Sequence, residues 1–194
     1  LRQFLQSRRP DEVGVELGSG NRRLTKEMIN IELFGFPNVD VIADAMQIPL
    51  ADATVDFVVI DTVLEHVPEP ALVVHEIHRI LRRGGQVICL APFIFPYHGY
   101  PRHFYNFSKD GLEHLFKGFS SCTVEMHIGP TSALTNLLSE YLSVALSGES
   151  KMLYTLWKGL GLLPIFYLKY LDKLWRPQGN AMRISSCLCA IAVK

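Results

Sequence analysis

The segment V-G-V-E-L-G-S-G-N at residues 13–21 constrains the fold more than any other part of the chain. Its apolar residues up to Leu17 predict a buried strand. Gly18 and Gly20 then predict a tight turn, because glycine adopts positive φ without steric cost and leaves no Cβ in the way. Open α/β sheets bind ligands at the carboxyl ends of their strands. The turn therefore predicts the floor of a nucleotide-type pocket, with an ordinary strand-to-loop turn as the alternative.

Apolar runs bounded by turn residues continue along the chain and predict the rest of a sheet. Strands are predicted at about Val13 to Leu17, Met28 to Leu33, Val39 to Ala43, Val55 to Ile60, Gln86 to Ala91, Cys122 to Ile128 and Ile184 to Val193. Helical segments separate most of these strands, and such alternation is typical of a mostly parallel sheet covered by helices. We therefore predict a three-layer, doubly wound α/β fold whose last strand is antiparallel, with a helical insertion at about residues 131–180.

The connections between the predicted strands differ in kind. Seven residues separate Gly20 from Met28, whereas a parallel crossover normally needs about a dozen or more, so the first helix is at most a turn or two. Pro70 predicts the start of a later helix, and Gly84-Gly85 predicts its end. Ser108 is predicted to cap a short helix after the fifth strand.

Length and composition bound the class of protein. The 194 residues fit one domain. Lys plus Arg equals Asp plus Glu, at 19 each, and the basic pairs are scattered, which argues against a nucleic-acid partner. The four cysteines lie in apolar runs without Cys-x-x-Cys spacing, so we expect buried, reduced thiols. The visible start has no secretion-signal pattern, and we predict a cytoplasmic protein.

Acidic residues follow the first four predicted strands, and three short motifs accompany them. The motifs read D-A-M-Q-I-P at residues 44–49, L-E-H-V at residues 64–67 and L-R-R-G-G at residues 81–85. Together with the glycine turn, they make residues 12–119 resemble the class I S-adenosylmethionine-dependent methyltransferases of the small-molecule type. The resemblance implies a Rossmann-like fold, S-adenosylmethionine as cofactor and methyl transfer to a small-molecule acceptor.

The resemblance also assigns cofactor contacts to individual residues. The glycine turn would pass under the methionine moiety, with Glu16 toward its amino end. Glu32 would accept hydrogen bonds from the two ribose hydroxyls, and Asp44 would accept one from the adenine amino group. The expected cofactor-binding residues are Glu16, Gly18, Ser19, Gly20, Glu32, Asp44, Ala45, Met46, Asp61 and Leu64.

Two departures from the family pattern keep alternatives open. Arg22 replaces the third glycine of the usual turn, and the first helix is nearly absent. A degenerate, non-catalytic cofactor-binding or interaction protein is therefore the alternative function. A nicotinamide-dependent dehydrogenase is disfavoured, because no long helix offers its N-terminus to a pyrophosphate.

The aromatic-rich loop at residues 93–107 predicts the acceptor side of the pocket. His98 or His103 is the candidate general base if the acceptor is a hydroxyl, and a packing role is the alternative for both. The expected substrate contacts are Phe93, Tyr97, Arg102 and Tyr105. Glu65 and His66 either act in the site or cap a helix. No metal ligands are predicted, since His75, His78 and His114 lie on predicted helices without a fourth partner.

Residues 152–168 contain a single charged residue, Lys158. Gly159, Gly161 and Pro164 interrupt this apolar run, which argues against a membrane span. One interpretation is an amphipathic lid or a surface that contacts lipid. Packing as an insertion over the sheet is the alternative that we prefer. Nothing in the sequence predicts an oligomeric state.

Overall fold

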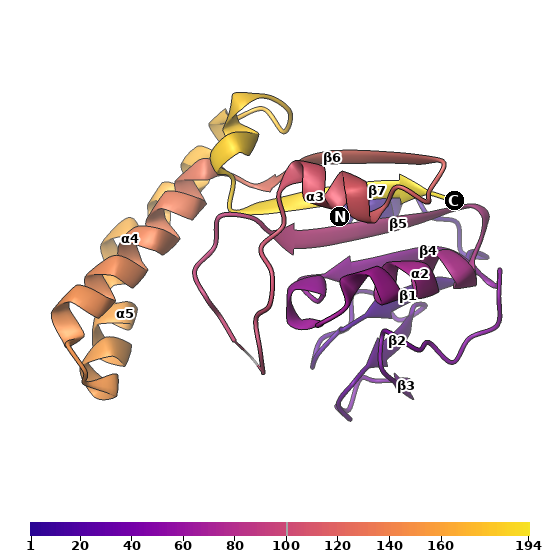
Figure 1. Ribbon diagram of the computed structural model, residues 1–194, viewed down its shortest axis with the longest axis horizontal. Coiled ribbons are helices and arrows are strands. Elements are labelled where there is room, and N and C mark those ends of the chain that lie inside the picture. Colours follow the sequence, from indigo (N-terminus) through magenta and orange to yellow (C-terminus); the bar gives the residue numbers. More distant parts are fainter. Residues whose placement is uncertain (100) are drawn as a thin grey trace.

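The computed structural model describes residues 1–99 and 101–194, without the side chains of Gln3 and residues 161–166. The chain forms one seven-stranded mixed sheet (Figure 1). The strands are β1 (Gly14–Leu17), β2 (Ile29–Glu32), β3 (Val41–Ile42), β4 (Val55–Asp61), β5 (Leu81–Pro92), β6 (Ser121–Ile128) and β7 (Cys187–Val193). The helices are α1 (Arg2–Gln6), α2 (Pro70–Ile80), α3 (Lys109–Leu115), α4 (Pro130–Ser147) and α5 (Lys151–Ile165), with 3₁₀ helices η1 (Leu64–His66), η2 (Phe166–Leu174) and η3 (Asn180–Ile184).

The strand order is β3-β2-β1-β4-β5-β7-β6. The first five strands of that order are parallel, and β7 pairs antiparallel with both β5 and β6. The predicted mostly parallel α/β sheet with an antiparallel last strand is confirmed. The chain runs outward from β1 to β3 and then returns to the other side of β1 as β4. This reversal opens a crevice at the carboxyl ends of β1 and β4.

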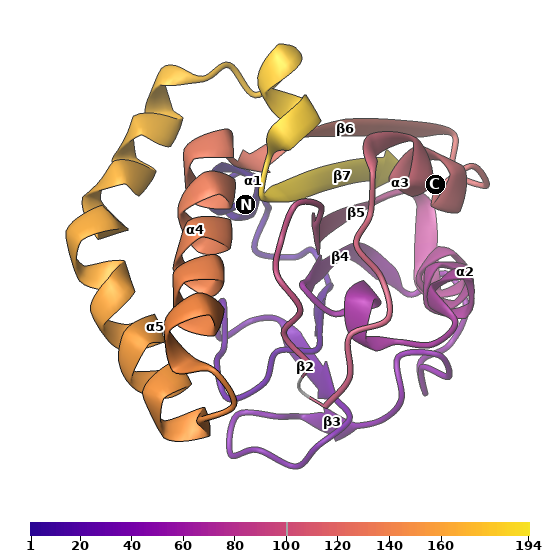
Figure 2. The same cartoon turned by 60° about the vertical axis from the view of Figure 1, so that its left-hand side comes forward.

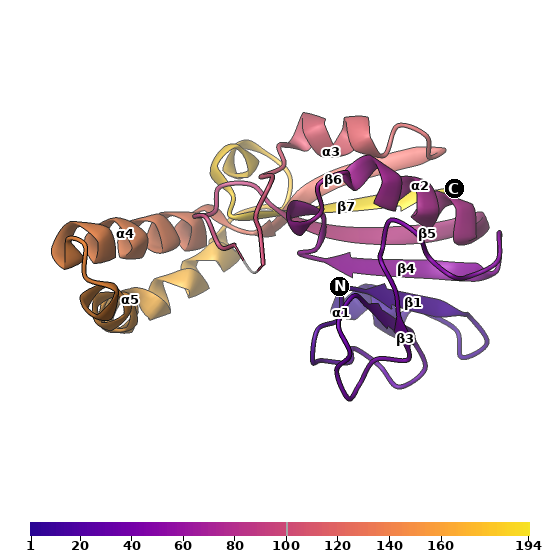
Figure 3. The same ribbon diagram turned by 60° about the horizontal axis from the view of Figure 1, so that its bottom comes forward.

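Alternate residues of the strands pack into two separate apolar layers, one on each face of the sheet. Val58 and Ile60 of β4 pack in the larger layer with residues of α2 and α3. Phe57 and Val59 face the other side, where α1 supplies Phe4. Figure 3 shows α2 and α3 on one face of the sheet and α1 on the other. The predicted three-layer arrangement is present, although the five-residue α1 makes the second helical layer thin.

Helix α2 begins where predicted and ends earlier than predicted. Pro70 stands in its first turn, and its buried face includes Val73 and Ile77. Leu81 is already extended and opens β5, so the prediction that Gly84-Gly85 ends the helix is wrong. Gly84 instead takes a φ of 77° within the β5 segment. The other predicted cap is confirmed, because the Ser108 hydroxyl accepts a hydrogen bond from the backbone N–H of Gly111.

The connection from β1 to β2 carries no helix in the described part of the chain. Residues 18–28 form a loop, and β1 and β2 still pair in parallel. The buried carboxylate of Glu16 accepts a hydrogen bond from the backbone N–H of Leu24, at 3.1 Å. The loop is thus held by side-chain contacts in place of helical hydrogen bonds.

Helices α4 and α5 lie side by side (Figure 2) and project beyond the sheet (Figures 1 and 3). The buried residues of α4 include Ala133, Ser139 and Ser143, whose small side chains let neighbouring helices approach closely. Because the two helices project beyond the sheet, the expected packing of this segment as an insertion over the sheet is wrong. The leucines of α4 are exposed, Leu134 to 64%. Among the described residues, no helix combines the length and apolar character needed to cross a membrane.

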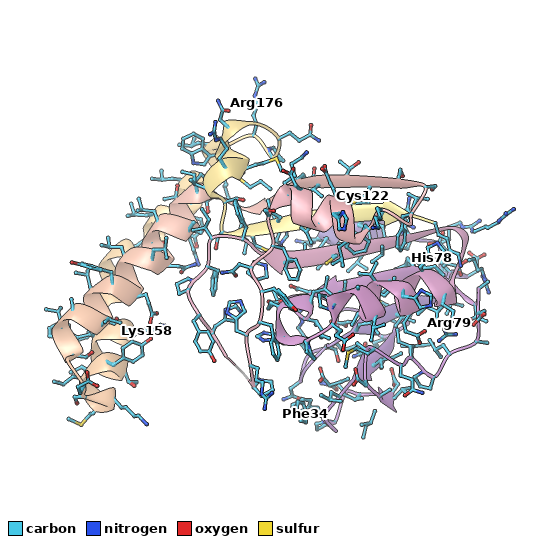
Figure 4. All side chains as sticks on the ribbon, in the orientation of Figure 1. Phe34, His78, Arg79, Cys122, Lys158 and Arg176 are labelled. Atoms are coloured by element: carbon cyan, nitrogen blue, oxygen red, sulfur yellow. The ribbon has the colours of Figure 1, made fainter. Side chains whose placement is uncertain are left out.

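Arg79 of α2 ties the segment between β3 and β4 to the helix layer (Figure 4). Its guanidinium donates hydrogen bonds of 2.7–2.8 Å to the backbone oxygens of Leu50 and Ile48 and to the carboxylates of Glu76 and Asp52. Glu76 also accepts from the backbone N–H of Ile48, at 2.8 Å. One planar side chain thus holds a long connection that contributes few backbone hydrogen bonds of its own.

We expect Arg79→Ala to lower the free energy of unfolding by about 2 kcal/mol, because hydrogen bonds to charged groups contribute about 1.5–3 kcal/mol. Arg79→Lys should recover only part of the loss, since an ammonium cannot bridge these oxygens as a planar fork does. Urea denaturation followed by circular dichroism measures both variants. Exposed Arg83 supplies the matched control, Arg83→Ala. Equal midpoints for Arg79→Ala and Arg83→Ala would contradict the role of Arg79.

Candidate functional site

A cavity of about 320 Å³ opens at the carboxyl ends of β1, β2, β3 and β4. Its lining comes from the glycine turn after β1, the segments after β2 and β3, the segment from Thr62 to Val67, and Pro101 of the loop after β5. Most of its exposed wall is apolar. Position, size and lining are those of a small-molecule site in an open α/β sheet.

The two glycines of the turn have different structural roles. Gly18 takes a φ of 69° and donates its N–H to the backbone oxygen of Ile31, at 2.8 Å. A Cβ at Gly18 would lie 2.2 Å from Cγ2 of Val63. Gly20 takes a φ of 57°, and none of the described atoms would lie within 4 Å of a Cβ there. Gly18 therefore permits a close crossing of two segments, whereas Gly20 leaves bare backbone beside the cavity.

Glu32 is the carboxylate that the fold fixes at the cavity wall. One of its oxygens accepts from the N–H of Gly20 and the other from the N–H of Leu33, both at 2.8 Å. Each carboxylate oxygen can accept more than one hydrogen bond. Glu32 is thus oriented by backbone amides and retains acceptor capacity for a ligand.

Glu16 and Asp61 contact Arg22 behind the cavity lining. Arg22 Nη2 lies 2.6 Å from Oδ2 of Asp61, and its Nε lies 3.6 Å from Oε1 of Glu16. Burial raises the pKa of Glu16 above its ordinary value, against the lowering effect of the Leu24 amide. The arginine that replaces the third glycine therefore bridges the two strand-end acids.

The segments after β3 and β4 complete the base of the cavity. Asp44 and Ala45 line it, and Oδ1 of Asp44 accepts from the N–H of Met46, at 2.8 Å. Thr62 also lines the cavity and takes a φ of 56°, a left-handed conformation that is uncommon for a residue other than glycine. Backbone strain of this kind tends to occur at functional sites.

Glu65, His66 and His98 form a polar cluster beside the cavity. Glu65 is fully buried, and apart from its own backbone N–H neither carboxylate oxygen has a hydrogen-bond donor among the described residues. Nε2 of His98 lies 3.6 Å, and Nε2 of His66 3.9 Å, from Oε1 of Glu65. Burial raises the pKa of Glu65 to about 7 and lowers the pKa of His98 below its ordinary value.

Of the other residues predicted in the loop after β5, His103 and Tyr105 make hydrogen bonds that hold the loop in place. Nε2 of His103 lies 2.8 Å from the backbone oxygen of Tyr105, and its Nδ1 accepts from the N–H of His98 at 3.4 Å. The Tyr105 hydroxyl donates to the backbone oxygen of Pro68, at 2.8 Å. Phe93 packs against the core, and the side chains of Tyr97 and Arg102 are exposed. Tyr97, His103 and Tyr105 also line a separate, shallow hollow.

The structure brings half of the predicted cofactor residues together. Those that line the cavity are Gly18, Gly20, Glu32, Asp44 and Ala45, whereas its lining does not include Glu16, Ser19, Met46, Asp61 and Leu64. The cavity-lining residues Leu33, Phe34, Phe36 and Pro101 were not predicted from the sequence. Phe34 and Phe36, which follow the strand-end acid Glu32 closely, were a usable signal. Pro101 had none, because its place depends on the path of a long loop.

Comparison with known proteins adds sequence relatives. Residues 3–89 match the family model of a methyltransferase domain. Demethylmenaquinone methyltransferase from Staphylococcus saprophyticus is 38% identical over 69 residues, which is 36% of this chain and 27% of that protein. The chain thus covers about a quarter of the length of that relative.

Solved structures of low sequence identity share the fold. A SAM-dependent methyltransferase from Archaeoglobus fulgidus superposes with a TM-score of 0.62 at 15% identity, over 100% of this chain and 91% of that one. Phosphoethanolamine N-methyltransferase 2 from Haemonchus contortus, solved in complex with S-adenosyl-L-methionine, gives a TM-score of 0.57 at 15% identity, over 94% and 48% of the two chains.

The two glycines of the turn allow a matched test of the cavity floor. We expect Gly18→Ala and Gly20→Ala each to cost about 1–2 kcal/mol from positive φ. Gly18→Ala should cost clearly more, because its Cβ would also overlap Val63. Urea denaturation of the two ligand-free variants measures the difference, and Gly18→Ala in a Val63→Ala background should recover part of it. Equal losses for the two single variants would contradict the close crossing.

Proposed function

We propose that the protein transfers the methyl group of S-adenosylmethionine to a small-molecule acceptor, and the match of residues 3–89 to the family model of a methyltransferase domain supports this proposal. The observation that carries this proposal is Glu32, a carboxylate held by two backbone amides at the wall of a cavity beside a glycine turn. Such a carboxylate suits a pair of adjacent ribose hydroxyls and disfavours a ligand with phosphate at that place.

The cavity residues fit the remaining parts of this cofactor. Asp44 and Ala45 would hold the adenine ring between the segments after β3 and β4, with Phe34 and Phe36 as apolar contacts. The bare backbone at Gly18 and Gly20 would lie along the methionine moiety. Glu16 and Asp61 would act through Arg22, which links both acids to the turn.

When bound, the cofactor supplies a methyl group on a positively charged sulfur. The electron pair of the acceptor atom would form the new bond to the methyl carbon as the carbon–sulfur bond breaks, and the sulfur would leave as a neutral thioether. The protein therefore mainly has to hold the acceptor about 3–3.5 Å from the methyl carbon and exclude water. For a hydroxyl acceptor, the proton has to reach a base, and Nε2 of His98 is the better placed of the two predicted histidines, since both nitrogens of His103 contact the loop.

The four free cysteines support a reducing, cytoplasmic setting, which stays a prediction. A non-catalytic cofactor-binding protein remains the alternative function, because Arg22 occupies the place of the third glycine. Binding of S-adenosylmethionine distinguishes both the enzyme and the non-catalytic binding protein from a protein that does not use this cofactor. Turnover then distinguishes the enzyme from the binding protein.

We expect Glu32→Ala to weaken binding of S-adenosylhomocysteine at least tenfold, since each hydrogen bond to a charged group contributes about 1.5–3 kcal/mol. Glu32→Gln keeps the acceptor oxygen and should lose less. Isothermal titration calorimetry measures the dissociation constants, with exposed Glu27→Ala as the control. An unchanged constant for Glu32→Ala would remove Glu32 from the site. No binding by the unmodified protein would contradict the proposed function.

The helical hairpin formed by α4 and α5 supports an apolar acceptor that is reached at a lipid surface. Its exposed apolar side chains include Leu134, Tyr141, Met152 and Leu156. The sequence from 151 to 176 adds Lys151, Lys169, Lys173 and Arg176 and the acid Asp172, while Lys158 of α5 is paired with Glu140 of α4. Arg176 lies at the top of Figure 4, at the end of the hairpin where the chain returns toward the sheet. An apolar surface with basic residues suits an anionic membrane interface, and the curated relative is named for a menaquinone precursor.

We expect the protein to sediment with vesicles that contain phosphatidylglycerol and to bind pure phosphatidylcholine more weakly. Replacing Met152 and Leu156 by Glu should move the protein to the supernatant, because a buried charge opposes insertion of the apolar surface. Leu72 of α2 is 45% exposed, so Leu72→Glu is the matched control. Unmodified protein that stays in the supernatant with both lipids would contradict a lipid contact.

A further inference from the structure

We propose that Glu65, His66 and His98 form a binding site for one divalent transition-metal ion at the edge of the cavity. No metal ligands were predicted from the sequence, where His98 is a candidate base and Glu65 and His66 either act in the site or cap a helix. Glu65 and His66 come from η1 after β4, and His98 comes from the loop after β5. Their potential ligand atoms all lie within 4.8 Å of one another.

The ring orientations of the two histidines carry the proposal furthest. Nδ1 of His66 contacts the backbone oxygen of Arg102, and Nδ1 of His98 lies 3.1 Å from the backbone oxygen of Pro96. A carbonyl oxygen only accepts, so each Nδ1 carries the proton and each neutral ring keeps its lone pair on Nε2. Both Nε2 atoms face the same carboxylate oxygen. Metal-binding histidines are typically held by such a hydrogen bond from the other ring nitrogen.

The carboxylate of Glu65 gives an independent reason for a ligand. It is fully buried, and apart from its own backbone N–H no donor from residues 1–99 and 101–194 reaches either oxygen. The histidine atoms that face it are acceptors in the tautomers described above. A buried carboxylate without a donor or cation is strongly unfavourable. A cation held jointly by the carboxylate and the two lone pairs would satisfy all three groups.

The separations suit a small metal ion after a slight closure. Zinc bonds to histidine nitrogen and carboxylate oxygen at about 2.0–2.2 Å, so two ligands of a tetrahedral ion lie about 3.4 Å apart. The observed separations from Oε1 of Glu65 are 3.6 Å to His98 and 3.9 Å to His66. Two imidazoles and one carboxylate favour Zn²⁺, Co²⁺ or Fe²⁺ over Mg²⁺ and Ca²⁺, which prefer oxygen ligands.

Three protein ligands would leave a coordination position for another molecule, as in catalytic rather than structural zinc sites. His66 also lines the cavity. The acceptor would then be a compound whose hydroxyl or keto oxygen binds the ion, and the ion would favour the deprotonated hydroxyl. This assignment of the acceptor rests on the proposed methyl transfer, whereas the metal site itself does not. His98 would then act on the acceptor through the ion rather than as a free base.

The test is a titration of chelator-treated, tag-free protein with Zn²⁺, without cofactor or acceptor. Cys122 is partly exposed while the other three cysteines are buried, so all proteins carry Cys122→Ser to remove competing thiolate binding. Calorimetry should show that one equivalent of Zn²⁺ binds to the parent protein. Bound Co²⁺ should give the visible absorption that is typical of an ion with a low coordination number. Glu65→Gln and His98→Asn should each weaken Zn²⁺ binding at least tenfold. Exposed His75 supplies the control, His75→Asn, which should bind as the parent does.

Thermal unfolding gives a second readout, because an ion that binds only the folded state raises the unfolding temperature. Zn²⁺ should raise it in the parent and in His75→Asn but not in Glu65→Gln. Stoichiometric binding that Glu65→Gln and His98→Asn leave unchanged would overturn the proposal, and so would no binding of Zn²⁺ or Co²⁺ to the parent. Cofactor binding is measured separately, so failure of the metal site and failure of the methyltransferase proposal give different results.

Discussion

The reversal of strand order at β1 and β4 is the constraint on which the rest of the structure depends. Because β1 and β4 are adjacent and parallel, the loops that follow them leave the same edge of the sheet close to each other. The crossing is so close that Gly18 has no room for a Cβ beside Val63. The cavity, the orientation of Glu32 and the position of η1 all follow from this one contact region.

Buried acids at this edge are stabilised in different ways. Glu16 is balanced by a backbone amide and by Arg22, which also contacts Asp61. Glu65 faces two imidazole nitrogens whose tautomers make them acceptors. In the first arrangement Arg22 places its charge 3.6 Å from Oε1 of Glu16 and donates a hydrogen bond to Asp61, while that oxygen of Glu16 has no hydrogen-bond donor among the described residues. The second needs either a proton on one of its members or a cation between them, because the buried carboxylate otherwise faces only acceptors.

The sheet and the helical hairpin place apolar groups in opposite ways. The strands bury their apolar residues on both faces, between α2, α3 and α1. Helix α4 instead buries small and hydroxyl-bearing residues against its neighbours and exposes its leucines. Glu140 accepts from both Lys158 and Tyr154 and links α4 to α5. Polar contacts therefore link the two helices, while the apolar surface of the hairpin stays exposed.

Local signals in the chain were enough to predict the strands, the glycine turn and the acids at the strand ends. These features depend on the backbone preferences and the apolar pattern of a few neighbouring residues. Gly18, Gly20, Glu32, Asp44 and Ala45 could be placed at one edge on that basis. The contacts of Arg22 with two acids, of Glu65 with His98, and the direction of the hairpin were decided by the tertiary structure. Each depends on how segments far apart in the sequence cross, and the chain encodes those crossings through packing rather than through any local pattern.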